Sequence, residues 1–250
     1  MTVGMILIVL AALTAIGLPV SIAILVPSLL YLLVNEIPLS SAIARMSGSV
    51  NSFTVMAVPF FIMAGQVMNH SGLTEKLVAF TRCLVGHLRG GLAQVNVAAS
   101  IIFAGMSGSA VADAGGLGSV LIGPMKKDGY TASFSAAITA ASSTIGPIIP
   151  PSIPMVIFAV IAEESVGRLF LAGAVPGFLL GLLMMVMLRF LPQTRDIKVY
   201  PRASLNEFRA HLPAGILAIL MPAIILIGIT MGVFTPTEAA AVAAVYATIV

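Results

Sequence analysis

The sequence has 250 residues, of which 59% are hydrophobic and only 8% are charged. Ordinary soluble domains are roughly one quarter charged, and a globule of this size needs a polar surface, so the composition excludes a soluble fold. A net charge of +3 with no tryptophan and no basic run argues against a nucleic-acid partner. No P-loop or dinucleotide fingerprint is present. The sequence predicts an all-α, polytopic protein of the lipid bilayer, with no cofactor and no enzymatic activity.

The first apolar segment covers residues 3–34 and is interrupted by Gly17-Leu18-Pro19. It has no basic n-region and no small-residue cleavage site, so we interpret it as structure and not as a signal peptide. Its length fits one long, tilted and broken span, and it also fits a pair of half-helices.

A short loop that contains Glu36 and Arg45 is expected next, followed by a second span at about residues 50–68. Residues 70–91 then mix charged residues with regularly spaced apolar ones. This pattern predicts an amphipathic helix that lies in the membrane interface.

Residues 92–124 are apolar at both ends, but their centre, residues 105–116, is rich in glycine, serine and alanine. Two complete spans would need ~40 residues. If the segment folds at its centre, each arm has about 16 residues and a length of roughly 24 Å, which is shorter than the ~30 Å hydrocarbon core. We therefore predict a re-entrant helical hairpin. Small residues that only allow tight helix packing are the alternative.

The distribution of charge supports this topology. With a re-entrant hairpin, ten of the twelve lysine and arginine residues lie on one face, and only Arg45 and Arg168 lie on the other. The positive-inside rule then makes the basic face cytoplasmic. A hairpin that crossed the membrane once would separate Lys126 and Lys127 from the basic residues of the 70–91 segment.

The next span, residues 131–162, contains four prolines, Pro147, Pro150, Pro151 and Pro154. They cannot all lie inside one continuous helix, because each interior proline removes a hydrogen bond and clashes with the preceding turn. The span should break near residues 146–151. Unpaired carbonyls are costly in lipid, so broken backbone there is expected to line a cavity or to contact an ion. A purely structural kink is the alternative.

Residues 170–188 are predicted to return across the membrane, and a polar stretch, 192–212, precedes a further span at 213–231. A capping box at Thr235–Glu238 then begins a new helix. A lipid-facing helix should not end at Val250 without a polar flank, so we expect the polypeptide to continue. We divide the chain into scaffold-type spans (1–91), a transport-type hairpin with a broken helix (92–168), and connecting spans that begin a second repeat (169–250).

The hairpin tip and the break carry the candidate chemistry. Hydroxyls and freed carbonyls are good ligands for a hard cation, and the N-termini of half-helices suit an anionic group. Asp113 is the only acidic residue inside a predicted intramembrane segment, which makes it a functional candidate. The alternative is that Asp113 caps the second arm of the hairpin.

Three motifs, Ser107–Asp113, Gly146–Ser152 and Gly232–Glu238, together resemble the N-terminal part of the large membrane (permease) subunit of tripartite ATP-independent periplasmic (TRAP) transporters, the DctM-like subunit. The likeness runs along essentially the whole chain. It implies sodium-coupled uptake of a carboxylate, such as a dicarboxylate or sialic acid, across a bacterial or archaeal cytoplasmic (inner) membrane. It also implies an elevator mechanism built on inverted repeats, a small membrane subunit, and a soluble periplasmic substrate-binding protein as partners.

The resemblance implies a sodium site on the hairpin tip and the break, with Asp113 supporting the tip. The residues assigned to sodium are Ser107, Gly108, Ser109, Asp113, Gly146, Ile149 and Pro150. For substrate contact we assign Ser142, Ser143, Thr144, Pro151 and Ser152. The sequence departs from the family in having one hairpin-plus-break unit, so the second unit is expected beyond Val250 and the chain should not transport alone.

Three other functions are considered. A hairpin and a broken helix can also line a channel, and another carrier of the same superfamily would share these elements. Gly105-Met106-Ser107-Gly108 matches the pattern of an intramembrane serine protease, which needs a base beside Ser107. No histidine lies in a later span, and His211 lies in a predicted loop.

Overall fold

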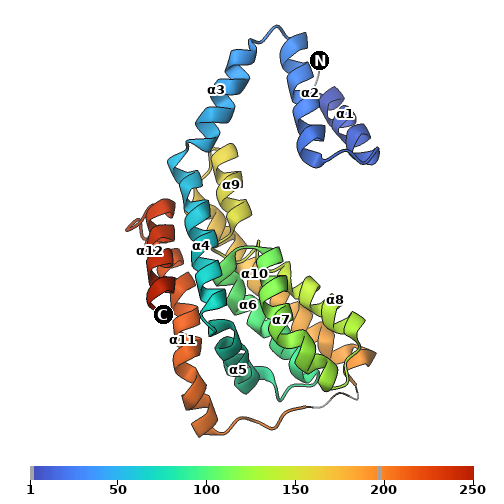
Figure 1. Cartoon of the computed structure of the whole chain (residues 1–250), viewed down its shortest axis with the longest axis vertical. Coiled ribbons are helices and arrows are strands. Elements are labelled where there is room, and N and C mark those ends of the chain that lie inside the picture. The colour runs from blue at the N-terminus through green and yellow to red at the C-terminus, as the bar shows by residue number, and fades with distance from the viewer. Residues whose placement is uncertain (1–2, 196, 198) are drawn as a thin grey trace. The chain divides into compact units, whose positions relative to one another are not determined.

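The computed structural model describes residues 3–195, 197 and 199–250 (Figure 1). In this part of the chain the regular structure is entirely helical, which confirms the all-α prediction. The chain forms two units, Met1–Ser52 and Phe53–Val250. The helices are α1 (Val3–Ala15), α2 (Val20–Val34), α3 (Leu39–Val50), α4 (Ala57–His70), α5 (Leu73–Val85), α6 (Gly91–Ser107), α7 (Ala110–Lys127), α8 (Ala132–Ser143), α9 (Ile153–Ile161), α10 (Val166–Phe190), α11 (Leu205–Thr230) and α12 (Pro236–Ile249), with short 3₁₀ turns at Phe53–Met56 and Pro192–Thr194.

In the first unit the segment 3–34 forms two helices, α1 and α2, which pack against each other. The chain turns at Gly17, whose φ of 89° favours glycine, and Pro19 precedes the first turn of α2. The prediction of a short loop around Arg45 is wrong, because Leu39–Val50 forms helix α3. The segment is rich in serine, which is typical of loops, but its apolar residues have a helical spacing. Pro38 is the extended residue just before the helix.

In the second unit the predicted span at 50–68 is the 3₁₀ turn followed by α4. The alanine-rich face of α12 packs closely along α4. Two hydrogen bonds fix α12: Thr237 Oγ1 donates to the carbonyl of Phe53 at 2.6 Å, and Tyr246 OH donates to the carbonyl of Leu217 at 2.9 Å. The capping box predicted at Thr235–Glu238 is present.

Helix α5 has the predicted amphipathic pattern, with Leu73, Leu77 and Phe80 buried on one face. Helix α11 packs along it. The loop predicted at 192–212 is shorter than expected. Helix α11 already begins at Leu205, with a capping box between Ser204 and Glu207. The location of α5 in the membrane interface stays a prediction.

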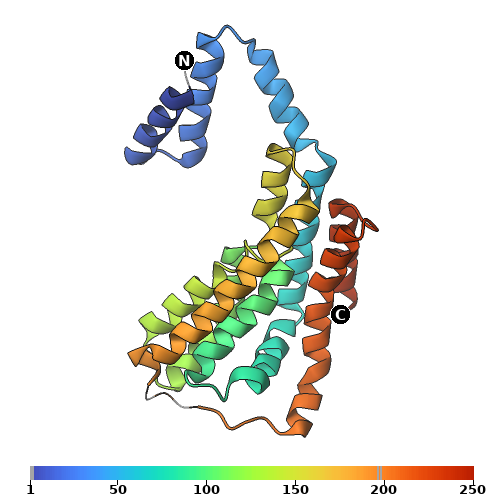
Figure 2. The same cartoon turned by 180° about the vertical axis from the view of Figure 1, so that it is seen from behind.

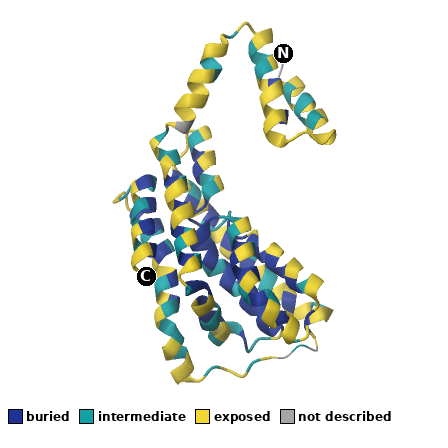
Figure 3. Cartoon of the chain, viewed as in Figure 1, coloured by how far each residue is buried: buried dark blue, intermediate teal, exposed yellow. Residues whose placement is uncertain are grey.

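Helices α6 and α7 form a helical hairpin, and α8 packs against both (Figure 1). Helix α6 is buried on nearly all sides, which Figure 3 shows as the dark blue centre of this unit. Polar side chains join α6 to α8: Asn96 Nδ2 donates to Thr139 Oγ1 at 2.7 Å, and Ser100 Oγ donates to Ser142 Oγ at 2.8 Å. Figure 2 shows α10 running along the other side of α6.

The predicted break in the span 131–162 is confirmed, because α8 ends at Ser143 and α9 begins at Ile153. Ser152 is the N-cap of α9 and fixes the point where the helix begins again. Its Oγ accepts from the amide of Met155 at 3.3 Å and donates to the carbonyl of Pro147 at 2.6 Å.

Among the described residues, three segments are long and apolar enough to cross a membrane: Phe53–His70, Val166–Phe190 and Leu205–Thr230. Helices α6 and α7 have 17 and 18 residues. At 1.5 Å per residue each is about 26 Å long, shorter than the ~30 Å hydrocarbon core. Re-entry of the hairpin, the elevator arrangement and the three-part division of the chain stay predictions.

Candidate functional site

The hairpin tip is held by hydrogen bonds among its own residues. Gly108 ends α6 with a φ of 59°, and Ser109 begins α7 by accepting from the amide of Ala112 at 3.4 Å. Ser107 Oγ accepts from the amide of Ser109 at 3.2 Å and donates to Asp113 Oδ1. Ser109, and not Asp113, therefore supplies the side-chain cap of α7, which removes the capping alternative for Asp113.

The tip lies directly against the break. A Cβ added to Gly108 would lie 2.5 Å from the carbonyl oxygen of Pro151. On the opposite side, a Cβ on Gly146 would overlap Asp113 Oδ2. Glycines on both segments thus allow the backbone of the hairpin to approach the backbone of the break.

Asp113 is completely buried between these two segments. Its Oδ1 accepts the hydroxyl of Ser107, whereas its Oδ2 faces Gly146 and has no hydrogen-bond partner among the described residues. An unpaired carboxylate oxygen away from water is costly unless a cation or a donor reaches it.

The break supplies further oxygens. In the described part of the chain, the carbonyls of residues 148–151 accept no hydrogen bond. Hydroxyl, carbonyl and carboxylate oxygens form a donor set that fits a hard cation such as sodium.

The structure brings together most of the residues assigned to sodium: Ser107, Gly108, Ser109, Asp113, Gly146 and Pro150. Ile149 lies in the same break, but it packs against α10, where a Cβ on Gly177 would lie 2.5 Å from Ile149 Cγ1. The assignment of all seven residues to sodium stays a prediction.

Of the five residues assigned to substrate, Ser142 and Ser143 end α8, and the other three lie in the break. Ser142 and Ser143 are buried and hydrogen-bonded to the α6–α8 interface and to the carbonyl of Thr139. Thr144 is exposed and bonds its own helix, and Pro151 contacts the tip. Ser152 is committed to capping α9. Their contact with substrate stays a prediction, and their hydrogen bonds give the serines a structural role.

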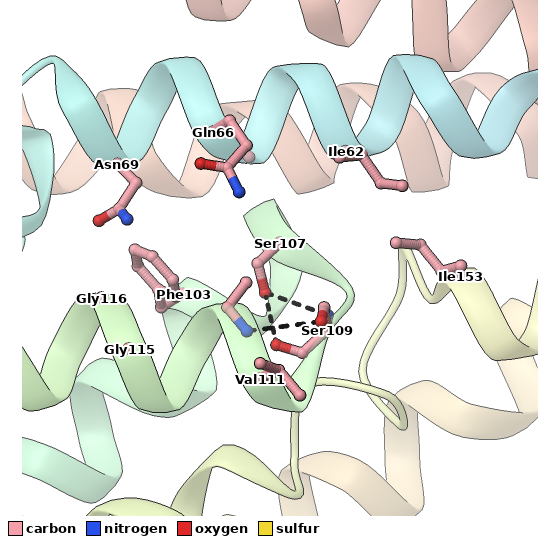
Figure 4. Close-up of a pocket in the computed structure, with 12 residues that line it drawn as sticks. Ile62, Gln66, Asn69, Phe103, Ser107, Ser109, Val111, Gly115, Gly116 and Ile153 are labelled. Carbon is pink, nitrogen blue, oxygen red and sulfur yellow. Dashed lines mark hydrogen bonds between the residues drawn. The ribbon is translucent and has the colours of Figure 1, made fainter. Parts of the chain in front are cut away.

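A cavity of about 420 Å³ lies between α4 and the hairpin (Figure 4). Four polar side chains line it: Ser107 and Ser109 from the tip, and Gln66 and Asn69 from α4. Sequence reasoning did not anticipate a contribution from α4. The available signal was two carboxamides three residues apart in a helix that is otherwise apolar up to His70.

A row of glycines on α10 was also missed. Gly173, Gly177 and Gly181 are spaced four residues apart and are buried. A Cβ on Gly173 would lie 2.5 Å from the carbonyl of Ile148, and one on Gly181 would lie 2.5 Å from Ile101 of α6. This row is the repeated small-residue spacing that lets membrane helices pack closely, and it was readable in the sequence.

The apolar helices, the hairpin and the facing break define a polytopic membrane protein that places irregular backbone within its helical core. Over residues 7–250 the sequence matches the family described as Tripartite ATP-independent periplasmic transporter, DctM component. The chain therefore belongs to this family, and it is an integral protein of the inner membrane.

Individual relatives support the same family assignment. The chain is 46% identical over 232 residues to the sialic acid TRAP transporter large permease protein SiaM of Vibrio cholerae, covering 92% of this chain and 54% of that protein. It is 42% identical over 236 residues to the sialic acid TRAP transporter permease protein SiaT of Haemophilus influenzae (94% and 38%). It is 45% identical over 198 residues to the C4-dicarboxylate TRAP transporter large permease protein DctM of Pseudomonas aeruginosa (79% and 46%). These relatives are named as permeases and not as enzymes. The chain spans about half the length of the curated relatives it matches.

Proposed function

We propose that this chain is part of a sodium-coupled permease that carries a small organic anion across the inner membrane. The observation that carries the proposal is Asp113 Oδ2, a buried carboxylate oxygen that faces the broken helix and has no hydrogen-bond partner among the described residues. A sodium ion between the tip and the break would compensate this charge and use the free carbonyls. Sodium would be a co-transported substrate and not a resident cofactor.

The anion and the partners are inferred from the relatives. Their names include sialic acid and C4-dicarboxylate, and the family is tripartite. We therefore expect a soluble periplasmic binding protein to deliver a carboxylate and a small membrane subunit to accompany the permease. The N-terminus of α7, which lines the cavity beside Ser109, has the polarity that suits an anionic group.

The other functions receive less support. An intramembrane serine protease would need a histidine or lysine base beside Ser107, and neither is among the described residues that line the cavity. An ion in a channel passes along an open pore, whereas Asp113 is completely buried between the tip and the break. This position favours a carrier over a channel.

The test replaces Asp113 by asparagine, which keeps the size of the side chain and removes its charge. In the full-length permease, reconstituted in proteoliposomes with its partner proteins, Asp113→Asn should lower sodium-driven uptake of sialic acid or succinate at least tenfold. In detergent, sodium chloride should raise the melting temperature of the wild type above its value in potassium chloride, and this difference should disappear in the variant.

Asp128→Asn is the matched control, because it is the same chemical change at the far end of α7 and keeps an oxygen that can accept from Tyr200. It should retain both the uptake and the sodium effect. Wild-type sodium dependence in Asp113→Asn would refute the proposed role of this carboxylate.

A further inference from the structure

We infer that Gln66 and Asn69 of α4 bind the hydroxyl-bearing part of the transported anion, in the cavity that α4 forms with the hairpin. The inference rests on the proposed transport function and adds to it a second wall of the site and a class of substrate.

The cavity has the character of a small-molecule site. Its volume of about 420 Å³ falls within the ~300–1,000 Å³ that is usual for ligand pockets. Apolar side chains, among them Ile62, Phe103 and Ile153, make up most of its wall. The few polar groups come from two separate elements, which is how a pocket fixes the orientation of a ligand.

The two carboxamides face the hairpin from the same side of α4. Gln66 and Asn69 are three residues apart, so they share one helix face, and Figure 4 shows both projecting toward the hairpin. Within the described part of the chain, the Gln66 side chain makes no hydrogen bond. Asn69 Oδ1 accepts from Thr74 Oγ1 at 3.1 Å, which leaves the NH₂ group of Asn69 as a donor.

A carboxamide in an apolar membrane helix is costly unless a partner satisfies it. The residues around Gln66 on α4, Met63 to Val67, are otherwise apolar. Position 66 therefore supplies an unused donor and acceptor directly at the cavity. Gln66 is exposed at the cavity, so a ligand that enters the cavity can pair with both groups.

The absence of charge on this wall indicates the kind of ligand group it binds. None of the described residues that line the cavity is charged. A hydroxyl both donates and accepts, as a carboxamide does, whereas an ionised carboxylate only accepts. A hydroxylated acid can pair with both the donor and the acceptor of the Gln66 carboxamide, whereas the carboxylates of a C4-dicarboxylate can only accept from it. Sites that hydrogen-bond a hydroxyl reject analogues that lack it.

The experiment measures ligand-induced stabilisation of the full-length permease in detergent with saturating sodium chloride. Three probes are titrated: sialic acid, gluconate and succinate. At least one of the two hydroxylated acids should raise the melting temperature, and succinate should not. With Gln66→Leu, the concentration needed for half the effect should rise about tenfold, the loss expected for one hydrogen bond of ~1.4 kcal/mol.

The matched control is Gln193→Leu, the same change at an exposed position outside the cavity. It should titrate as the wild type does. Gln66→Leu should also keep the sodium-dependent rise in melting temperature in the absence of acid, which shows that the variant folds and that its cation site is intact.

Three outcomes would overturn the inference: wild-type titration in Gln66→Leu, stabilisation by succinate alone, or no stabilisation by any of the acids. Each leaves the proposed sodium-coupled function to be judged by Asp113→Asn. Suppose that Asp113→Asn loses the sodium effect while Gln66→Leu titrates as the wild type does. The proposed transport function would then stand, and α4 would be excluded from the substrate site.

Discussion

Gly108 is the position where the contact between tip and break is most easily disrupted. Its φ of 59° costs a residue with a side chain roughly 1–2 kcal/mol. A Cβ there would also lie 2.5 Å from the carbonyl oxygen of Pro151, where ordinary contact begins at 3.4 Å. Because the obstacle is backbone in a proline-rich segment and not a flexible side chain, the tip itself must retreat by about 0.9 Å.

We therefore expect Gly108→Ala to lower the free energy of unfolding by about 2 kcal/mol or more, which corresponds to a fall of roughly 4–8 °C in melting temperature. The same retreat moves Ser107, and with it Asp113, away from the carbonyls of the break. The rise in melting temperature with sodium chloride, measured against potassium chloride, should shrink or vanish.

Gly123→Ala provides the comparison within α7, since a Cβ at position 123 meets nothing within 4 Å. There alanine should match the wild type or be more stable by about 0.5–1 kcal/mol, because glycine inside a helix is unfavourable. If Gly108→Ala melts like the wild type and keeps its full sodium effect, close approach of the tip is not what holds the site together.

Two further predictions concern the Tyr200–Asp128 hydrogen bond and the topology of the hairpin. Tyr200 OH donates to Asp128 Oδ2 at 2.6 Å, and burial together with this bond raises the pKa of Tyr200 to about 12. Tyr200→Phe should therefore cost about 1 kcal/mol in thermal unfolding. This contribution should be constant below pH 10 and decline only as pH rises toward 12; an unchanged melting temperature would exclude it. For topology, single cysteines are introduced in a Cys83→Ser background. A cysteine at Lys127 should react with impermeant maleimide only from the cytoplasmic side, and one at Ser165 only from outside. Reaction of position 127 from outside would contradict the re-entrant hairpin.

The sequence predicted the break and the hairpin because the signals there are strong and local. Isolated prolines are tolerated inside α7, α10 and α11, but the three at 147, 150 and 151 fall within five residues and interrupt the helix. The glycine-rich centre of residues 105–116 marks a turn. The helix at 39–50 was missed for the opposite reason. Its serines resemble a loop in composition, and at 12 residues it is short for a helix that crosses a membrane.

The partners of the site could not be predicted from local pattern. Which helix faces the hairpin depends on tertiary packing. The sequence around Gln66 therefore does not indicate that this residue shares a cavity with Ser109. Likewise, the serines at 142 and 143 lie beside the break in the sequence, yet the helix turns them toward α6. The glycine row on α10 was readable as a close-packing surface, but its partner, the break itself, was not.

Ser107 connects the two parts of the site. Its side chain lines the cavity that α4 closes, and its hydroxyl donates to the carboxylate that faces the break. A cation bound at Asp113 Oδ2 would draw this carboxylate toward the carbonyls of the break, and the hydrogen bond would carry that displacement to Ser107. The position of a cavity-lining residue would then depend on whether the cation is bound. Thermodynamic linkage requires the converse as well, so an acid in the cavity would tighten sodium binding by the same factor. We therefore propose that this buried serine–aspartate pair would make binding of the cation and of the anion depend on each other.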